Sequence, residues 1–527
     1  MKKLLLVTLS AGVFFLAQAQ QSSIDLGRPT GQIISRYIYG QFAEHLGNCI
    51  YDGFYRKGQI RMDIVKALKD IRVPLLRWPG GCFADQYHWR DGIGDKKGRP
   101  ARVNSSWGMV IEDNSFGTHE FLQLCDLIGC EPYIGANVGT GSPEEMKEWI
   151  EYLNYDGPSE LAKLRAMNGH PAPYHIKFWG VGNESWGCGG RMTAEEYANK
   201  YREFAEFCKD YPGSPLKKIA SGAFDDDYHW TETLMKNVSL RRIQGLSYHY
   251  YASVDGSGKN HADHFNELQY FKGLKSGLHM DELIRRHSAI MDVYDPDKKV
   301  WLVVDEWGAW YGKGTELAPE YNLSQQSTMR DALLTGITLD IFQRHADKVA
   351  VANVAQSINC IHSLMLAQGD KFTVTPTFHV FQMYLPHRGA QAIRAEFTAP
   401  AISNPLANAP IPVGGNSYRG SLEAVKSLAG LSGSASIATS GNGKRLTLSV
   451  VNPHLDKPLT TEVAVRGASI ASAKGTVLVS KDVHDHNDFA HPNAVKPAAA
   501  TLTAPTGGRL LHTFPPASVT TLELTLA

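Results

Sequence analysis

Short apolar runs alternate with amphipathic stretches along the first two thirds of the chain. β-Branched and aromatic residues in these runs predict eight strands: Tyr37–Phe42, Pro74–Trp78, Pro132–Asn137, Phe178–Asn183, Lys218–Gly222, Gly245–Tyr250, Val300–Asp305 and Val349–Ala355. Helical spacing predicts helices between most of them, including Met62–Lys69, His119–Ile128, Ala194–Lys209, Glu282–Tyr294 and Gln325–Arg344. Strands that alternate with helices indicate a parallel sheet, and eight such units indicate a (β/α)8 TIM barrel. An open doubly wound sheet is disfavoured because no Gly-rich phosphate-binding motif follows the first strand.

The pattern changes after about residue 385. A stretch rich in Pro, Gly, Ala and Ser is followed by short segments of alternating polarity with no convincing helix. That pattern predicts an antiparallel, jelly-roll-like β-sandwich. We therefore expect residues 37–385 to form the barrel, residues 386–527 to form the C-terminal β-sandwich, and residues 20–36 to add an N-terminal strand to that sandwich.

Residues 1–19 have the features of a signal peptide. Lys2 and Lys3 precede a short apolar stretch, and Ala17-Gln18-Ala19 fits a cleavage site. The apolar stretch is too short for a membrane anchor, and no other long apolar run exists. The sequence therefore predicts a protein that is exported to the periplasm or the medium and begins near Gln20.

Charge and cysteine content narrow the function classes. The chain has 53 basic and 53 acidic residues, so no surplus of positive charge indicates a nucleic acid or an anionic membrane as partner. Its 22 Tyr and 10 Trp suit sugar rings but also suit a large core. Seven Cys without a CxxC pair make a zinc site improbable and leave buried thiols or one or two disulfides open. We expect no metal and no cofactor; the sequence leaves a homo-oligomer open.

Two apolar strands end in a glutamate. Phe178 to Glu184 reads FWGVGNE, and Val300 to Trp307 reads VWLVVDEW. A carboxylate at the end of a buried strand is costly unless it has partners or a task. Two of them provide the acid/base and the nucleophile that a two-carboxylate glycosidase requires. A solvated loop charge would explain either glutamate alone but explains the pair less well.

If the barrel prediction is right, catalytic groups lie at the C-terminal ends of the strands. The polar residues expected there are Glu44, Arg77, Asn137, Asn183, Glu184, His249, Tyr251, Glu306 and Gln356. Arg77 needs an acidic partner inside an apolar strand, and we favour Glu306 or Glu44 over a purely structural ion pair. Two further clusters, Asp225 to Asp227 and His484 to Asp488, are better explained as solvated or turn-forming loops than as metal sites.

An ordered set of motifs resembles glycoside hydrolase family 51, the α-L-arabinofuranosidases. The motifs are GQFAEHLG from Gly40, RWPGG from Arg77, GNE ending at Glu184, DEW around Glu306 and NVAQ ending at Gln356. The resemblance implies a retaining mechanism without a metal, with Glu184 as acid/base and Glu306 as nucleophile. It also implies that Glu44, Asn183, Tyr251 and Gln356 contact an arabinofuranosyl residue in the −1 subsite.

One position departs from the family pattern. Cys82 follows the Pro-Gly-Gly turn where the family often has Asn, and a thiol is a weak hydrogen-bonding group. We expect Cys82 to line the −1 subsite; a thiol packed beneath the turn, or half of a disulfide, is the alternative.

The function predicted is an exo-acting α-L-arabinofuranosidase acting on plant oligo- or polysaccharides such as arabinan. An endo-β-1,4-glucanase, a β-xylosidase and a non-catalytic carbohydrate-binding protein are the competing readings.

Overall fold

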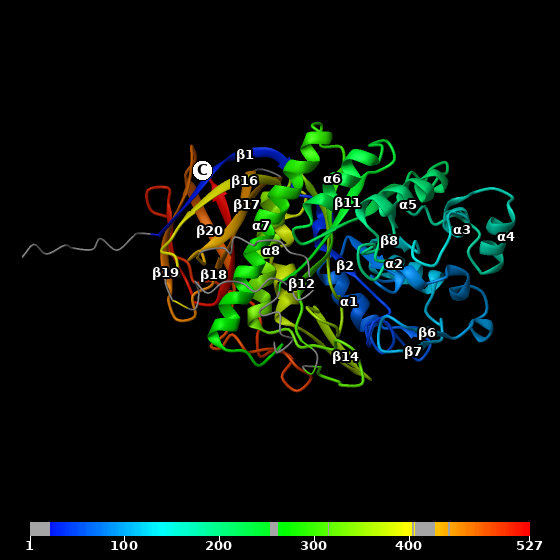
Figure 1. Cartoon of the computed structure of the whole chain (residues 1–527). Helices are drawn as coiled ribbons and strands as arrows, with labels where there is room; N and C mark the ends of the chain where they lie inside the picture. The colour runs from blue at the N-terminus through cyan, green and yellow to red at the C-terminus, as the bar shows by residue number, and fades with distance from the viewer. Residues whose placement is uncertain are drawn as a thin grey trace, which may run out of the picture.

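The structure is a computed structural model that describes residues 22–252, 262–312, 314, 316–402, 405, 427–440 and 443–527. The predicted signal peptide lies outside these residues. The chain forms a barrel surrounded by helices and a separate large sheet, with two long helices where they meet (Figure 1).

Eight parallel strands close into a barrel, as predicted. In spatial order they are β10 (Lys217–Phe224), β11 (Gly245–Ala252), β12 (Trp301–Ala309), β13 (Val349–Val354), β2 (Gly40–Phe42), β5 (Leu75–Trp78), β8 (Glu131–Ala136) and β9 (Phe178–Val181). Each overlaps one of the eight predicted strands. Strand β2 is shorter than the predicted strand Tyr37–Phe42, because residues Arg36–Tyr39 form a 3-10 helix, η1, capped by the Ser35 side chain. Short apolar runs were sufficient to find these strands because both faces of each strand are buried.

The helices are α1 (Met62–Asp70), α2 (Thr118–Ile128), α3 (Pro143–Asn154), α4 (Glu160–Met167), α5 (Ala194–Phe207), α6 (Tyr228–Asn237), α7 (Glu267–Tyr294), α8 (Met329–Arg344) and α9 (Pro376–Met383). Thr193 and Glu196 form the predicted capping box of α5. Helix α7 begins at Glu267 and not at Glu282, because Asn266 supplies a capping box there with Gln269. Short 3-10 helices η2 to η5 lie at Ala84–Gln86, Trp89–Gly92, Lys96–Gly98 and Leu385–His387.

The second unit is a nine-stranded sheet. Its strands run in the order β21 (Ala498–Ala499), β20 (Ile470–Val479), β23 (Ser518–Leu526), β18 (Gly443–Asn452), β17 (Ser432–Ser440), β16 (Gln391–Thr398), β1 (Ser22–Ile33), β19 (Leu459–Val465) and β22 (Leu510–Phe514). Strand β1 precedes the barrel in sequence but lies in this sheet, antiparallel to β16 and parallel to β19. Three two-stranded hairpins complete the strands: β3–β4 (Tyr55–Arg56, Gln59–Ile60), β6–β7 (Arg102–Asn104, Val110–Glu112) and β14–β15 (Met365–Gln368, Lys371–Val374).

Helix α8 joins the barrel to the sheet. It contacts β12 on one side and β16, β17, β18 and β23 on the other, so residues 329–343 are buried all round. Asp340 lies inside this contact. Its Oδ1 accepts hydrogen bonds from the hydroxyls of Ser434 (2.7 Å) and Ser449 (2.5 Å), and its Oδ2 accepts one from Tyr384 (3.1 Å). Burial raises the pKa of Asp340 to about 6, although these hydroxyl groups oppose the shift.

We expect Asp340→Ala to lower the free energy of unfolding by on the order of 3 kcal/mol, because three buried hydroxyls lose their acceptor. Thermal and urea unfolding measure this loss. Asp297→Ala, which removes an exposed carboxylate paired with Lys299, is the control and is expected to change little. Equal stability of the two variants would contradict the role of Asp340 in joining the sheet to the barrel.

Candidate active site

A pocket opens where the barrel strands end. Residues from the ends of six strands and from the loops that follow them converge on it. Its lining consists of Glu44, Leu46, Gly81, Cys82, Trp107, Glu184, Tyr251, Glu306, Trp310, Gln356 and Ile361. This set includes the predicted residues Glu44, Cys82, Glu184, Tyr251, Glu306 and Gln356, and Arg77, Asn183 and His249 lie directly behind them.

Glu184 and Glu306 face each other across the pocket. One oxygen of each, with a ring nitrogen of His249, lie within 4.8 Å of one another. The Nδ1 atom of His249 is 2.9 Å from Glu184 Oε1 and 3.5 Å from Glu306 Oε2. Carboxyl groups about 5–5.5 Å apart are typical of retaining glycosidases, whereas inverting enzymes leave about 6.5–9.5 Å for a water molecule. The short approach in this pocket is that of a retaining site.

Arg77 and Tyr251 hold the two oxygens of Glu306. Arg77 Nη1 donates to Oε1 at 2.8 Å, and the Tyr251 hydroxyl donates to Oε2 at 2.7 Å. The partner of Arg77 is thus Glu306, and Glu44 is not bonded to it. Asp305 also faces inward: it accepts from the Tyr133 hydroxyl at 2.8 Å and lies 3.9 Å from Arg77 Nε. The pairing of β12 with both neighbouring strands shifts register around these residues, and such irregularities let consecutive side chains point to one side.

Glu184 is held in a tight turn after β9. Its φ is +41°, in the left-handed region that non-glycine residues seldom occupy. Its carbonyl accepts hydrogen bonds from the N–H groups of Gly187 (2.7 Å) and Gly189 (3.1 Å). The sequence GNES at this turn gave no sign of the unusual conformation. The left-handed conformation of Glu184 turns its carboxyl group back over the barrel, toward His249.

The surroundings give the two glutamates opposite pKa shifts. Burial raises the pKa of Glu184, helped by the charge of Glu306, against the hydrogen bond from His249. Burial alone would raise the pKa of Glu306 as well, but the charges of His249 and Arg77 and the hydrogen bonds from Arg77 and Tyr251 lower it. The pair therefore favours a protonated Glu184 beside an ionised Glu306. That is the division of labour between acid and nucleophile.

Glu44 and Gln356 form the opposite wall. Glu44 Oε1 accepts from the N–H groups of Gly81 (2.9 Å) and Phe83 (3.2 Å) and from Trp107 Nε1 (2.8 Å), and its Oε2 accepts from Gln356 Nε2 (3.0 Å). Burial and the charge of Glu306 raise the pKa of Glu44 to about 7. A carboxyl group of this kind can accept a hydrogen bond from a sugar hydroxyl when it is ionised and donate one to it when it is protonated.

Cys82 is not a free thiol, and the expectation of a thiol in the subsite is wrong. Its sulfur is bonded to Cys188, with the two Cα atoms 5.4 Å apart. The other five cysteines are unpaired, and four of them are buried. The two partners stand 106 residues apart, so their spacing in the sequence gave no sign of the pairing. Cys82 still lines the pocket, as part of the disulfide.

Several residues have roles that differ from their predicted ones or were missed. Asn137 binds its own loop, accepting from the N–H groups of Thr140 and Gly141, and does not line the pocket. Asp85, which the pattern of the sequence did not single out, accepts from the N–H groups of Val138, Gly139 and Asn183 and so joins two strand-end loops. Burial raises its pKa to about 7.

The clusters Asp225 to Asp227 and His484 to Asp488, which we interpreted as loops without a metal, agree only in part with that interpretation. Asp227 caps α6, but Asp225 is buried, and burial raises its pKa to about 7. Of the described residues, only two groups bring three metal-binding atoms within 4.8 Å: Glu184–His249–Glu306 and Cys82–Glu184–Cys188. The His484 cluster is not among them; His484 instead stacks on Phe265. In the group Glu184–His249–Glu306, Glu306 already forms an ion pair with Arg77. In the group Cys82–Glu184–Cys188, the two sulfurs are bonded to each other.

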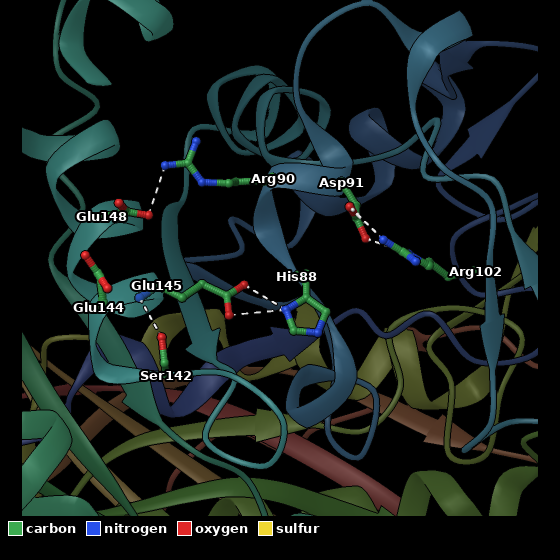
Figure 2. A pocket seen from close by; sticks show the side chains of 8 residues that line it. All are labelled: His88, Arg90, Asp91, Arg102, Ser142, Glu144, Glu145 and Glu148. Atoms are coloured by element: carbon green, nitrogen blue, oxygen red, sulfur yellow. Dashed lines mark hydrogen bonds and ion pairs between the residues drawn. The ribbon is translucent and has the colours of Figure 1, made fainter. Parts of the chain in front are cut away.

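A second hollow lies beside the N-terminal end of α3 (Figure 2). Its charged groups neutralise one another: His88 pairs with Glu145, Arg90 with Glu148, and Arg102 with Asp91. None of these side chains is buried, so the hollow has no buried carboxyl pair like the one at the barrel end.

A closed (β/α)8 barrel that holds an acid and an ionised carboxylate this close defines a glycoside hydrolase of the two-carboxylate class. Comparison with known proteins identifies the family. Residues 67–269 match the family model "Alpha-L-arabinofuranosidase 1 domain", and residues 305–518 match "Alpha-L-arabinofuranosidase C-terminal domain". The chain therefore belongs to the α-L-arabinofuranosidases of glycoside hydrolase family 51, as its similarity to individual proteins also shows.

An intracellular exo-α-L-arabinofuranosidase of Bacteroides ovatus is 41% identical over 99% of this chain and 100% of its own length. The crystal structure of the GH51 arabinofuranosidase of Xanthomonas axonopodis pv. citri has a TM-score of 0.88 at 39% identity, covering 96% of this chain and 100% of that one. An α-L-arabinofuranosidase of Thermotoga maritima, solved as an arabinose complex, has a TM-score of 0.83 at 32% identity over 96% and 100%. In the described part of the chain, no helix combines the length and the hydropathy needed to cross a membrane.

We expect Tyr251→Phe to move the acidic limb of the kcat/KM pH profile to higher pH. Without the hydroxyl, the ionised form of Glu306 loses one hydrogen bond, so its pKa rises and a larger share is protonated at low pH. At the optimum, kcat/KM should fall roughly tenfold to hundredfold, the effect of a hydrogen bond to a charged group. Tyr250→Phe is the matched control, because this neighbour on β11 binds Ser276 on the other face of the strand. An unshifted acidic limb in Tyr251→Phe would refute the assignment.

Proposed function

We propose that the protein is an exo-acting, retaining α-L-arabinofuranosidase. The observation that carries this proposal is the close approach of Glu184 and Glu306, one oxygen of each lying within 4.8 Å of the other, and their surroundings shift the two pKa values in opposite directions. The relatives named arabinofuranosidases support the sugar, and the name exo-α-L-arabinofuranosidase of the Bacteroides relative supports the mode of action. Terminal arabinofuranosyl residues of plant oligo- and polysaccharides such as arabinan are the proposed substrate.

The first half of the reaction forms a glycosyl-enzyme. Glu306 attacks the anomeric carbon while Glu184 gives its proton to the leaving oxygen. Arg77 and Tyr251 orient the attacking carboxylate through separate oxygens, which fixes its position before the substrate arrives. The raised pKa of Glu184 favours its protonated form, which this step requires.

The second half releases arabinose. Glu184, now ionised, takes a proton from water, and that water attacks the anomeric carbon and displaces Glu306 with retention of configuration. Asn183 supports both halves. Arg77 Nη2 donates to its Oδ1 at 2.6 Å, so its amide nitrogen is the free end, and that buried nitrogen has no hydrogen-bond partner within the described residues. It is available to donate to the sugar 2-hydroxyl, a bond expected to tighten in the transition state.

The shape of the pocket favours exo action over the endo-glucanase alternative. The Trp107 and Trp310 rings lie 6.4 Å apart, and Tyr251 packs edge-on against Trp310 at 5.0 Å, so aromatic rings stand around the carboxylates. Leu46 and Ile361 complete the apolar wall. A pocket walled in this way suits one terminal sugar and leaves little room for a chain running past on both sides.

Glutamate variants and a panel of aryl glycosides test the function. Glu306→Ala should lose nearly all activity on every substrate, because no other group can form the covalent bond. Glu184→Ala should keep the first step for good leaving groups, and azide should partly restore its turnover. Glu145→Ala, in the hollow of Figure 2, is the control and should keep full activity. Preference for another sugar, or equal losses on activated and unactivated substrates without azide rescue, would contradict the proposal.

We also propose that the protein is exported. Residues 1–19 support this through their signal-peptide pattern, and the disulfide supports it because disulfides persist in oxidising compartments. The name of the Bacteroides relative includes the word intracellular, so the location needs its own test. The proposed domain limits are 37–385 for the barrel and 386–527, with 20–36, for the sheet.

Expression of the full chain should yield a mature protein that begins near Gln20 outside the cytoplasm. N-terminal sequencing and cell fractionation measure this. A variant in which Lys2 and Lys3 are replaced by Glu should stay in the cytoplasm, since the positive n-region is needed for export. An unprocessed, cytoplasmic wild-type chain would disprove export and would leave the catalytic proposal intact.

A further inference from the structure

The Cys82–Cys188 disulfide lies against the acid of the active site. The Cys82 sulfur is 4.0 Å and the Cys188 sulfur 3.5 Å from the same oxygen of Glu184, Oε2. The other oxygen, Oε1, is the one that meets His249. Disulfide sulfurs carry no proton to donate, so they cover Oε2 without offering its charged form a strong hydrogen bond.

The disulfide also connects the two turns that carry the reacting groups. Cys82 belongs to the turn after β5, in which the Gly81 N–H binds Glu44. A Cβ atom on Gly81 would come within 2.7 Å of Glu306 Oε1, so this turn packs directly against the nucleophile. Cys188 closes the turn after β9, in which Glu184 has its left-handed φ of +41°. A conformation of that kind persists only where its surroundings hold it.

We propose that this disulfide is the positioning element for the general acid, so that hydrolysis of substrates with poor leaving groups depends on it. The inference rests on the proposed function and deepens it. Two effects support it: the disulfide ties the turn of Glu184 to that of Gly81, and it keeps hydrogen-bond donors away from Oε2. Glu184 is faced by His249 from β11, by Glu306 from β12 and by the more distant Arg77 from β5. None of these covers Oε2 as the two sulfurs do.

The same geometry makes the enzyme sensitive to reductants. Cys188 is exposed and Cys82 is partly exposed, so a small dithiol can reach the bond. Dithiothreitol would close to its cyclic disulfide, losing two electrons and two protons, while Cys82 and Cys188 each gain one electron and one proton. Among the described residues this is the only disulfide, so the effect of reduction there has one source.

The test compares the oxidised enzyme, the dithiothreitol-reduced enzyme and the Cys82→Ser/Cys188→Ser variant on two arabinofuranosides. One has a 4-nitrophenyl leaving group and the other an alkyl leaving group. In the double variant, we expect kcat/KM for the alkyl substrate, relative to that for the 4-nitrophenyl substrate, to fall about tenfold. This loss is a fraction of the contribution that general acid catalysis makes to the rate. The basic limb of the pH profile of this variant should move about one pH unit lower, because the hydroxyls of the two introduced serines donate to Glu184 and lower its pKa.

Reduction should change both quantities in the same direction, and dithiothreitol should have no effect on the double variant. Cys130→Ser, which changes an unpaired cysteine, is the control that should respond to dithiothreitol as the wild type does. A disulfide with a purely structural role would lower the melting temperature and leave the ratio and the basic limb unchanged, and this result would overturn the proposal. So would thiol labelling that finds Cys82 and Cys188 free in the native protein.

If reduction unfolds the enzyme, the double variant at a temperature where it is folded decides the question alone. The proposed function is judged separately, from hydrolysis of the 4-nitrophenyl arabinofuranoside by the oxidised wild type. If that substrate is not cleaved, the function is wrong, and the role of the disulfide is then measured on whichever glycoside of the aryl panel is cleaved.

Discussion

The guanidinium group of Arg77 is the constraint on which the site depends. It is 2% exposed, so its charge must be balanced inside the protein. It donates to Glu306 and Asn183, lies 3.9 Å from Asp305 and stands 4.5 Å above the Phe42 ring. One cation thus fixes the carboxyl group of Glu306 and the amide of Asn183 and lies beside Asp305, so the proposed catalytic groups depend on it. Together with the charge of His249, its always-charged state lowers the pKa of Glu306 despite burial.

The carboxyl groups around the site outnumber the fixed positive charges, and this imbalance distributes the protons. Glu44, Asp85, Glu184 and Asp305 all have raised pKa values, with burial as the leading cause, whereas the charges of His249 and Arg77 lower the pKa of Glu306. A second ionised carboxyl beside Glu306 would pay for burial without a cation of its own. The pKa values of the two glutamates are therefore shifted apart: the positive charges lower that of Glu306, while burial and the charge of Glu306 raise that of Glu184.

The sequence was sufficient where one local pattern determines the structure. Apolar runs located all eight barrel strands, and a glutamate at the end of an apolar strand located both carboxyl groups of the proposed catalytic pair. It was insufficient where distant segments decide. The partner of Cys82 lies 106 residues away, the left-handed turn at Glu184 depends on its neighbours, and Asp85 acquires its role only when the loop after β8 folds onto it. The start of α7 was missed for a different reason: its capping residue, Asn266, precedes a helical stretch with only weak segregation of apolar positions.

These buried charges also weigh against a protein that only binds carbohydrate. A binding site can recognise a sugar with neutral amides, hydroxyls and aromatic faces, none of which carries a large desolvation cost. Here Glu306 and Glu184, whose pKa values are shifted in opposite directions, lie within 4.8 Å of each other, and Glu184 has a backbone conformation that a non-glycine residue seldom adopts. Each feature lowers stability relative to an apolar or amide replacement. Their combination at one end of the barrel is explained by proton transfer to a leaving group and attack on an anomeric carbon, and binding alone would require neither.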